Sequence, residues 1–188
     1  MAACSAGLLG YTAAPVTPGI AVYSFASLFV RVCFLRVGPQ CVPDSPALLW
    51  TMLVLHWLLG MVLALFTYPV GQAAALALIG TLLTVALVHG ALMFANRSHR
   101  FGQTVTAMAG AEFMLGVLAL VISLWYYNGG NEWAASLFSL LLLGWNVVVA
   151  AHIFRHALDG TRLLGIASAL AYTMISYFVS GLLTGAGV

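Results

Sequence analysis

Four titratable side chains interrupt stretches of this sequence that are otherwise apolar, and they are the residues best able to do chemistry. Histidine can carry a proton near neutral pH or ligate a metal or haem iron, and a carboxyl group can exchange a proton with it. Such groups are costly inside apolar helices, which makes them functional candidates. At 1.5 Å per residue, all four lie about 8–13 Å from the same end of their segments. They are His56, His89, Glu112 and His152.

This shared depth predicts a polar layer in which at least two of the four side chains meet. We expect Glu112 to hydrogen-bond to a histidine, hydroxyl or amide of a neighbouring helix, or to stay protonated. The alternative is that each group makes an ordinary hydrogen bond between packed helices. A bound haem would require a histidine pair on facing helices, namely His56 with His152 or His89 with His152.

The motif His152-x-x-x-His156 places two histidines one helical turn apart at the end of an apolar run. Without a third ligand this spacing is weak evidence for zinc. His156 lies beside Arg155 and close to Asp159, and cations favour the carbonyl end of a helix. We interpret His156 as a helix-end residue and leave His152 as a member of the layer.

A stripe of hydroxyl groups recurs every four residues in the last apolar segment. Polar stripes on transmembrane helices face protein rather than lipid, so we expect helix packing or a partner here and not a substrate path. Asn146, in the preceding segment, is expected to face the same interior. The stripe comprises Ser168, Tyr172, Ser176 and Ser180, followed by the small residues Gly181 and Gly185.

The elements that must position these groups are transmembrane helices. The chain has 188 residues, 63% hydrophobic and 5% charged, whereas soluble domains carry about a quarter charged residues. The net charge of +2 is too small to indicate nucleic-acid binding. The sequence predicts an all-α, polytopic bundle of five spans, at 46–66, 73–95, 104–127, 133–158 and 161–184. Residues 1–45 form a separate N-terminal segment, and 46–188 the bundle.

The six basic residues are all arginine, and they fall on one side of the predicted membrane. By the positive-inside rule this predicts a cytoplasmic N-terminus and, after five spans, an external C-terminus. Arginine without lysine, together with abundant Ala, Gly, Val and Leu, is typical of a GC-rich bacterial gene. We therefore expect a multi-pass protein of the bacterial cytoplasmic (inner) membrane.

Residues 19–37 are apolar enough to span, but they contain Arg31 and Arg36. Ser24, Ser27 and Arg31 recur at helical spacing, which predicts an amphipathic helix in the inner interface, ending at Gly38-Pro39. The alternative is a sixth, short or re-entrant span. It is disfavoured because it would place Arg31 deep in the bilayer.

The sequence resembles bacterial Yip-type integral membrane proteins in its five spans and short loops. The resemblance also rests on two stretches, FGQTVTAMAGAEFMLGVLALV at 101–121 and the RHALDGTRLLG that precedes the last span. No catalytic motif comes with this resemblance, and the sequence itself has no nucleophile–base pair, phosphate-binding loop or pair of carboxylates. We therefore expect a non-enzymatic protein without catalytic, metal or cofactor residues. Such a protein would act as an accessory or assembly subunit of a membrane complex or as a bilayer scaffold. Its partners would be lipid and other membrane subunits or a second copy. Separately, LHWLLG at 55–60 resembles the first haem-ligating helix of small b-type cytochromes, which implies the alternative of a redox or proton-handling subunit with haem b.

Overall fold

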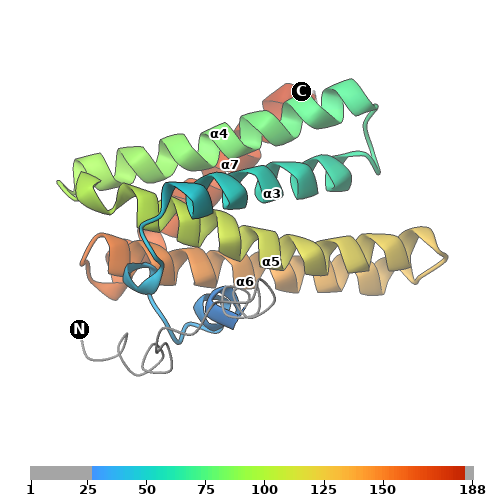
Figure 1. Cartoon of the computed structure of the whole chain (residues 1–188). Helices are drawn as coiled ribbons and strands as arrows, with labels where there is room; N and C mark the ends of the chain where they lie inside the picture. The colour runs from blue at the N-terminus through green and yellow to red at the C-terminus, as the bar shows by residue number, and fades with distance from the viewer. Residues whose placement is uncertain (1–26, 185–188) are drawn as a thin grey trace, which may run out of the picture.

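The computed structural model describes residues 27–184, and these form a bundle of long helices without any strand (Figure 1). Five helices are long and apolar enough to cross a membrane, as the sequence predicts. Short turns connect them, so successive helices run in opposite directions. They are α3 (Pro46–Ala64), α4 (Val70–Phe94), α5 (Phe101–Tyr127), α6 (Glu132–Ala157) and α7 (Arg162–Thr184).

Three of the five long helices end where the chain enters the left-handed backbone region. Asn96 after α4, Gly129 after α5 and Asp159 after α6 all have positive φ angles. In each case the next residue donates its backbone N–H to a carbonyl five positions back, which is the Schellman arrangement. The αL position in the sequence Asp159-Gly160 is thus occupied by the aspartate, a residue type that tolerates this conformation.

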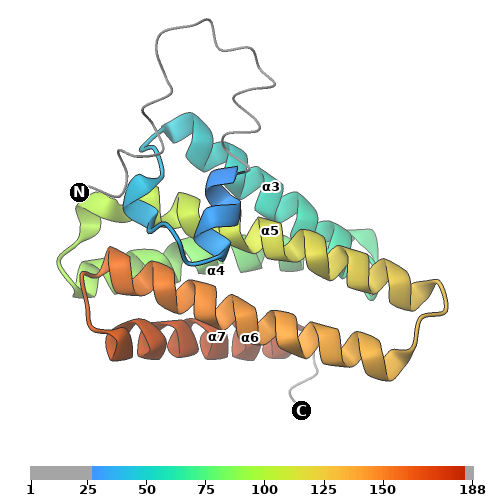
Figure 2. The ribbon, with the colours of Figure 1, turned by 90° about the horizontal axis from the view of Figure 1, so that it is seen from below.

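One half of the bundle has a buried core, whereas in the other half most side chains of α5 and α6 are exposed. Helix α3 packs against α4 and α5, α6 packs against α5 and α7, and α7 also contacts α4 (Figures 1 and 2). The first half of α5 is the centre of the core, where every residue from Thr104 to Ala111 is buried. At the other end of the bundle, α5 and α6 are largely exposed. We call the end that carries the turns at 95–100 and 158–161 the arginine end.

Side-chain contacts join the two turns at the arginine end. Arg100 donates to Asp159 Oδ1 at 2.9 Å and to the backbone carbonyl of His156 at 3.1 Å. Arg97 lies 3.1 Å from the other carboxylate oxygen of Asp159. The hydrogen bond from Arg100 holds the pKa of the Asp159 carboxyl below its usual value. Arg100 therefore caps the free carbonyls of α6 and ties the α4–α5 turn to the α6–α7 turn.

The segment before the bundle is a short helix, described over 27–33, that packs across the outside of α5 (Figure 2). The Phe29 ring is buried in a notch at Gly110, where an added Cβ would lie 2.2 Å from the ring. Arg31 on the opposite face is exposed, so the helix is amphipathic. It ends at a Schellman turn with Leu35 at φ 60°, before the expected stop at Gly38-Pro39. Among the described residues there is no sixth span, and residues 19–26 lie outside them.

Candidate functional site

Polar side chains from four helices lie at one level of the bundle. His56 is ten residues from the start of α3, Glu112 eleven from the start of α5, and Tyr172 ten from the start of α7. Thr84 is ten residues before the end of α4. At 1.5 Å per residue, each is about 15–16 Å from the arginine end, near the middle of a bilayer core about 30 Å thick.

Glu112 is the centre of this cluster. Its Oε1 accepts a hydrogen bond of 2.5 Å from the Tyr172 hydroxyl, and its Oε2 lies 3.1 Å from His56 Nε2. The exposed fractions of the Glu112 and His56 side chains are 13% and 20%. The imidazole is not aligned well enough for a hydrogen bond to Oε2, and this buried oxygen has no other described partner. The two side chains are therefore in contact, and a small rotation of the imidazole ring would allow a hydrogen bond between His56 Nε2 and Glu112 Oε2.

Local sequence explains why α3 and α5 approach closely enough for this contact. Gly116, one turn beyond Glu112, faces Leu59 of α3, and a Cβ on this glycine would meet the leucine Cδ2 at 2.7 Å. Leu59 lies three residues after His56, so both residues are on the same face of α3. A larger residue at position 116 would push the two helices apart and separate His56 from Glu112.

Two threonines contact the cluster. The Thr81 hydroxyl is placed to donate to the Ala77 carbonyl at 2.9 Å, and its oxygen lies 3.1 Å from His56 Nδ1. When Thr81 donates to Ala77, it accepts from His56, and Nδ1 is then the nitrogen that carries a proton. On the other side, Tyr172 donates to Glu112, so the 2.8 Å bond between Tyr172 and Thr84 must be donated by Thr84.

It follows that His56 and Glu112 face each other across a single exchangeable proton. With a proton on Nδ1, the pair can be an imidazolium beside a carboxylate or a neutral imidazole beside a carboxylic acid. These two forms have the same net charge and differ only in which side chain holds the shared proton. When that proton leaves the site, a neutral imidazole remains beside a carboxylate, and the pair then carries one negative charge.

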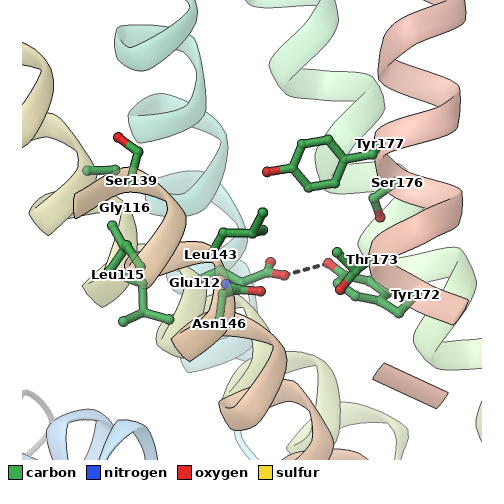
Figure 3. A pocket seen from close by; sticks show the side chains of 12 residues that line it. Glu112, Leu115, Gly116, Ser139, Leu143, Asn146, Tyr172, Thr173, Ser176 and Tyr177 are labelled. Carbon is green, nitrogen blue, oxygen red and sulfur yellow. Dashed lines mark hydrogen bonds between the residues drawn. The ribbon is translucent and has the colours of Figure 1, made fainter. Parts of the chain in front are cut away.

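An open cavity of about 390 Å³ reaches Glu112 from between α5, α6 and α7 (Figure 3). Figure 3 shows Glu112 directed across it toward Tyr172, with Thr173, Ser176 and Tyr177 on the same helix. Asn146 lines the opposite wall, eleven residues before the end of α6 and thus at the same level as Glu112. The Thr173 hydroxyl oxygen is buried without a described hydrogen-bond partner.

His89 and His152, the other two members of the expected layer, do not join it. Each is five residues from the end of its helix, or about 8 Å from the arginine end and half as deep as Glu112. His89 is exposed, with its ring edge-on to Phe101 at a centroid distance of 5.1 Å. His152 Nε2 lies 3.2 Å from the Val37 carbonyl and holds the N-terminal segment against α6.

Both histidine pairs considered for haem include His152, whose ring contacts the Val37 carbonyl and the His156 ring, the latter at a centroid distance of 4.5 Å. His56, its partner in one of the pairs, contacts Glu112 and Thr81 instead. Among residues 27–184, no group of three or more His, Cys, Asp or Glu side chains is placed to hold a metal ion.

The hydroxyl stripe of α7 divides into two halves. Tyr172 is buried, and Ser168 and Ser176 are partly buried, whereas Ser180 is exposed. A Cβ at Gly181 would meet nothing within 4 Å. Within the described chain this part has no packed neighbour, so the expectation that it packs against protein stays a prediction for contact with another chain, and Gly185 lies outside the described residues. The close contact between α6 and α7 is instead at Gly165, where a Cβ would lie 2.6 Å from the Ala151 carbonyl oxygen.

The sequence reasoning missed Thr81 and Thr84, and it gave Tyr172 a packing role only. A signal was present. Counting residues from the charged ends of the segments places Thr84 and Tyr172 at the depth of Glu112, and hydroxyls are the natural partners of an intramembrane carboxyl group.

The fold and this site define a class of protein, a multi-pass helical membrane protein with a titratable cluster inside its bundle. Comparison of the chain with models of protein families, with curated proteins and with solved structures gives no match. The function must therefore be argued from the site itself.

Proposed function

We propose that this chain is a non-enzymatic membrane protein that takes up and releases a proton at Glu112. The observation that carries the proposal is the contact between Glu112 and His56, 3.1 Å apart at mid-bundle, with Tyr172 donating to the same carboxyl group. Titratable groups at this depth are expensive and are typically kept for proton or ion handling.

The open cavity distinguishes this proposal from a structural role. A carboxyl group that only joins helices needs no route to water, and burying it completely would strengthen its hydrogen bonds. Glu112 instead lines a cavity of about 390 Å³, large enough for several water molecules. Water there can deliver a proton to the carboxyl group, and His56 can hold it.

Infrared spectroscopy of the purified protein in lipid tests the proposal directly. We expect the carbonyl band of a protonated carboxylic acid to appear as the pH is lowered and to shift in heavy water. Glu112→Gln should remove this band, whereas Glu132→Gln, which changes the exposed carboxylate at the start of α6, should retain it. His56→Gln should change the pH at which the band appears, because the histidine is the alternative site for the same proton. An unchanged band in Glu112→Gln would refute the proposal.

For the location of the protein, we propose the bacterial cytoplasmic membrane, with the arginine end in the cytoplasm. The support is the gathering of Arg97, Arg100, Arg155 and Arg162 at or beside two turns of one end, together with Glu132 at the other. This orientation puts the C-terminus outside. A reporter that works only in the cytoplasm should be inactive when it is fused after Val188, and activity of this fusion would contradict the orientation.

A second candidate is the function that the Yip-type resemblance implies, an accessory or assembly subunit or a bilayer scaffold. The observation that favours it is the free half of the α7 stripe, where Ser180 is exposed and Gly181 has open space around it. Small and hydroxyl residues allow close approach of another transmembrane helix. Gly181→Leu should then abolish co-purification of the partner without changing the stability of the isolated chain.

A further inference from the structure

The cavity at Glu112 continues toward the end of the bundle opposite the arginines. A second open cavity, of about 500 Å³, begins beside Glu132 and runs between α5 and α6. Ser139, Leu143 and Tyr177 line both cavities, so the two adjoin. Together they form one groove, which we call the α5–α6–α7 groove, with a carboxylate at its mouth and another at its inner end.

We propose that the α5–α6–α7 groove binds a small organic ammonium cation, with Glu112 as its counter-ion. The proposal rests on the proposed function, because Glu112 must lose its proton to pair with a cation. It also extends that function, because it names what would exchange with the proton.

The charge of the lining favours a cation. The groove contains Glu112 and Glu132, and its described lining has no arginine, lysine or histidine. His56 contacts Glu112 from α3, outside the lining, so the inner end of the groove is negative once the proton shared by these two residues has left. An anion in the groove would be repelled by the carboxylates at both ends. It would also lose its hydration without gaining a positively charged side chain as a partner. A metal ion would need several oxygen or nitrogen ligands in a fixed geometry, and no such cluster occurs among the described residues.

The shape and chemistry of the lining favour an organic cation over an inorganic one. Tyr126, Tyr127 and Tyr177 line the groove, and aromatic faces attract alkylammonium groups. Leucine side chains between them contact alkyl carbons, while the hydroxyls of Ser139, Thr173 and Ser176 can bond polar substituents. Volumes of a few hundred Å³ are typical of small-molecule sites.

Access to the groove is one-sided. Beyond Glu112 toward the arginine end, the interior is filled by fully buried side chains, including Val105, Met108, Ile153 and Phe154. Among the described residues there is thus no route to Glu112 from the arginine end, and a cation would enter along the open groove, past Glu132. When it arrives, the proton shared by Glu112 and His56 is released to the groove water, and the cation replaces it as the partner of the Glu112 carboxylate while His56 is left neutral. The bond broken is the carboxylic O–H bond or the His56 Nε2–H bond, depending on which side chain held the proton.

Choline and its neutral carbon isostere, 3,3-dimethylbutan-1-ol, provide a matched pair of probes that differ mainly in charge. We would titrate each into the full chain in detergent micelles and measure the heat of binding in two buffers of different ionisation enthalpy. Choline should bind with release of a proton and should bind more weakly at low pH. The neutral alcohol should bind at least about tenfold more weakly.

Two variants test the site. Glu112→Gln should lower choline affinity at least about tenfold and abolish the proton release. Ser139→Leu, placed where the two cavities join, should block choline while the infrared band of Glu112 still responds to pH. Ser180→Leu, on the exposed part of α7 outside the groove, is the matched control and should bind choline like the wild type.

The outcomes separate the two proposals. Equal binding of choline and the neutral alcohol would show a neutral pocket and overturn the cation site. Absence of choline binding, with Glu112 still titrating in the infrared, would overturn the cation site and leave proton handling intact. If Glu112 does not titrate at all, the proposed function fails and the cation site fails with it.

Discussion

Replacing Tyr172 with phenylalanine removes a single oxygen atom from the buried chain of hydrogen bonds. The Tyr172 hydroxyl donates to Glu112 at 2.5 Å and accepts from Thr84 at 2.8 Å. The phenyl ring keeps its packing, including the contact with Phe154 at a centroid distance of 5.9 Å. The change in free energy of unfolding therefore reports the polar contacts of this hydroxyl, chiefly those with Glu112 and Thr84, together with the nearby Ser176.

The magnitude follows from the two partners left behind. A hydrogen bond to a charged group contributes about 1.5–3 kcal/mol in soluble proteins, whereas interhelical hydrogen bonds in membranes average about 0.6 and reach about 1.7 kcal/mol. Thr84 can turn to a carbonyl of its own helix, as Thr81 does, so its loss is small. We expect Tyr172→Phe to destabilise the fold by about 1–2 kcal/mol, a factor of about 5–30 in the folding equilibrium.

Unfolding by SDS in mixed micelles, followed by circular dichroism, measures this difference. Tyr177→Phe is the matched control, because Tyr177 is 60% exposed and has no described hydrogen bond; it should cost less than about 0.5 kcal/mol. A double-mutant cycle with Glu112→Gln should give a coupling energy above about 0.5 kcal/mol. If Tyr172→Phe and Tyr177→Phe cost the same, or if the cycle is additive, the network does not stabilise the bundle as argued.

Three further predictions concern other parts of the chain. The Arg100 hydrogen bond lowers the pKa of Asp159, so the ionised carboxylate stabilises the fold above the ordinary carboxyl pKa, and this contribution is lost as the pH falls through the lowered pKa. In thermal melts at different pH values, Asp159→Asn should reduce this loss of stability in acid. The effect should be less than about 1 kcal/mol, because the Asp159 side chain is 44% exposed. Gly165→Leu should destabilise by several kcal/mol (about 2–4), since its Cβ would lie 2.6 Å from a backbone carbonyl oxygen, while Gly181→Leu should leave SDS unfolding of the isolated chain unchanged. Phe29→Ala should cost about 3 kcal/mol or more, because the buried ring fills a notch on α5, and limited proteolysis should then cut the segment before α3 faster; equal cutting rates would contradict the packing described.

The sequence predicted the helices more accurately than the site. Apolar length alone placed all five spans, with starts or ends shifted by up to about three residues, since capping turns such as the one at Asn96 set the last residue. Shared depth predicted that at least two of the four titratable residues would meet, and it left open whether Glu112 would contact a histidine, a hydroxyl or an amide. Depth could not select the right histidine, because a helix also rotates each residue by about 100° and turns His89 toward the surface.

Other features were beyond the sequence because they depend on how helices meet. The notch at Gly110 and the close contact at Gly165 arise from particular helix crossings, and nothing in the local sequence distinguishes these glycines from Gly181, which packs against nothing described. The cavity beside Glu112 depends likewise on the distance between α5 and α7, which no pattern within either segment encodes.

The polar contacts around Glu112 have a mechanical consequence for the bundle. Hydrogen bonds join α5, α7 and α4, and His56 of α3 contacts Glu112 and is hydrogen-bonded to Thr81 of α4, so none of these helices can slide by a turn of about 5.4 Å without breaking a contact. Helix α6 has no described hydrogen bond to these residues. Near the arginine end α6 is fastened by Arg100 and by the crossing at Gly165, whereas its first half, from Glu132 onward, is mostly exposed. The width of the groove at this half of α6 therefore depends on packing contacts, such as that between the Phe138 and Trp125 rings at a centroid distance of 6.3 Å, and not on the polar contacts that keep the other four helices in register.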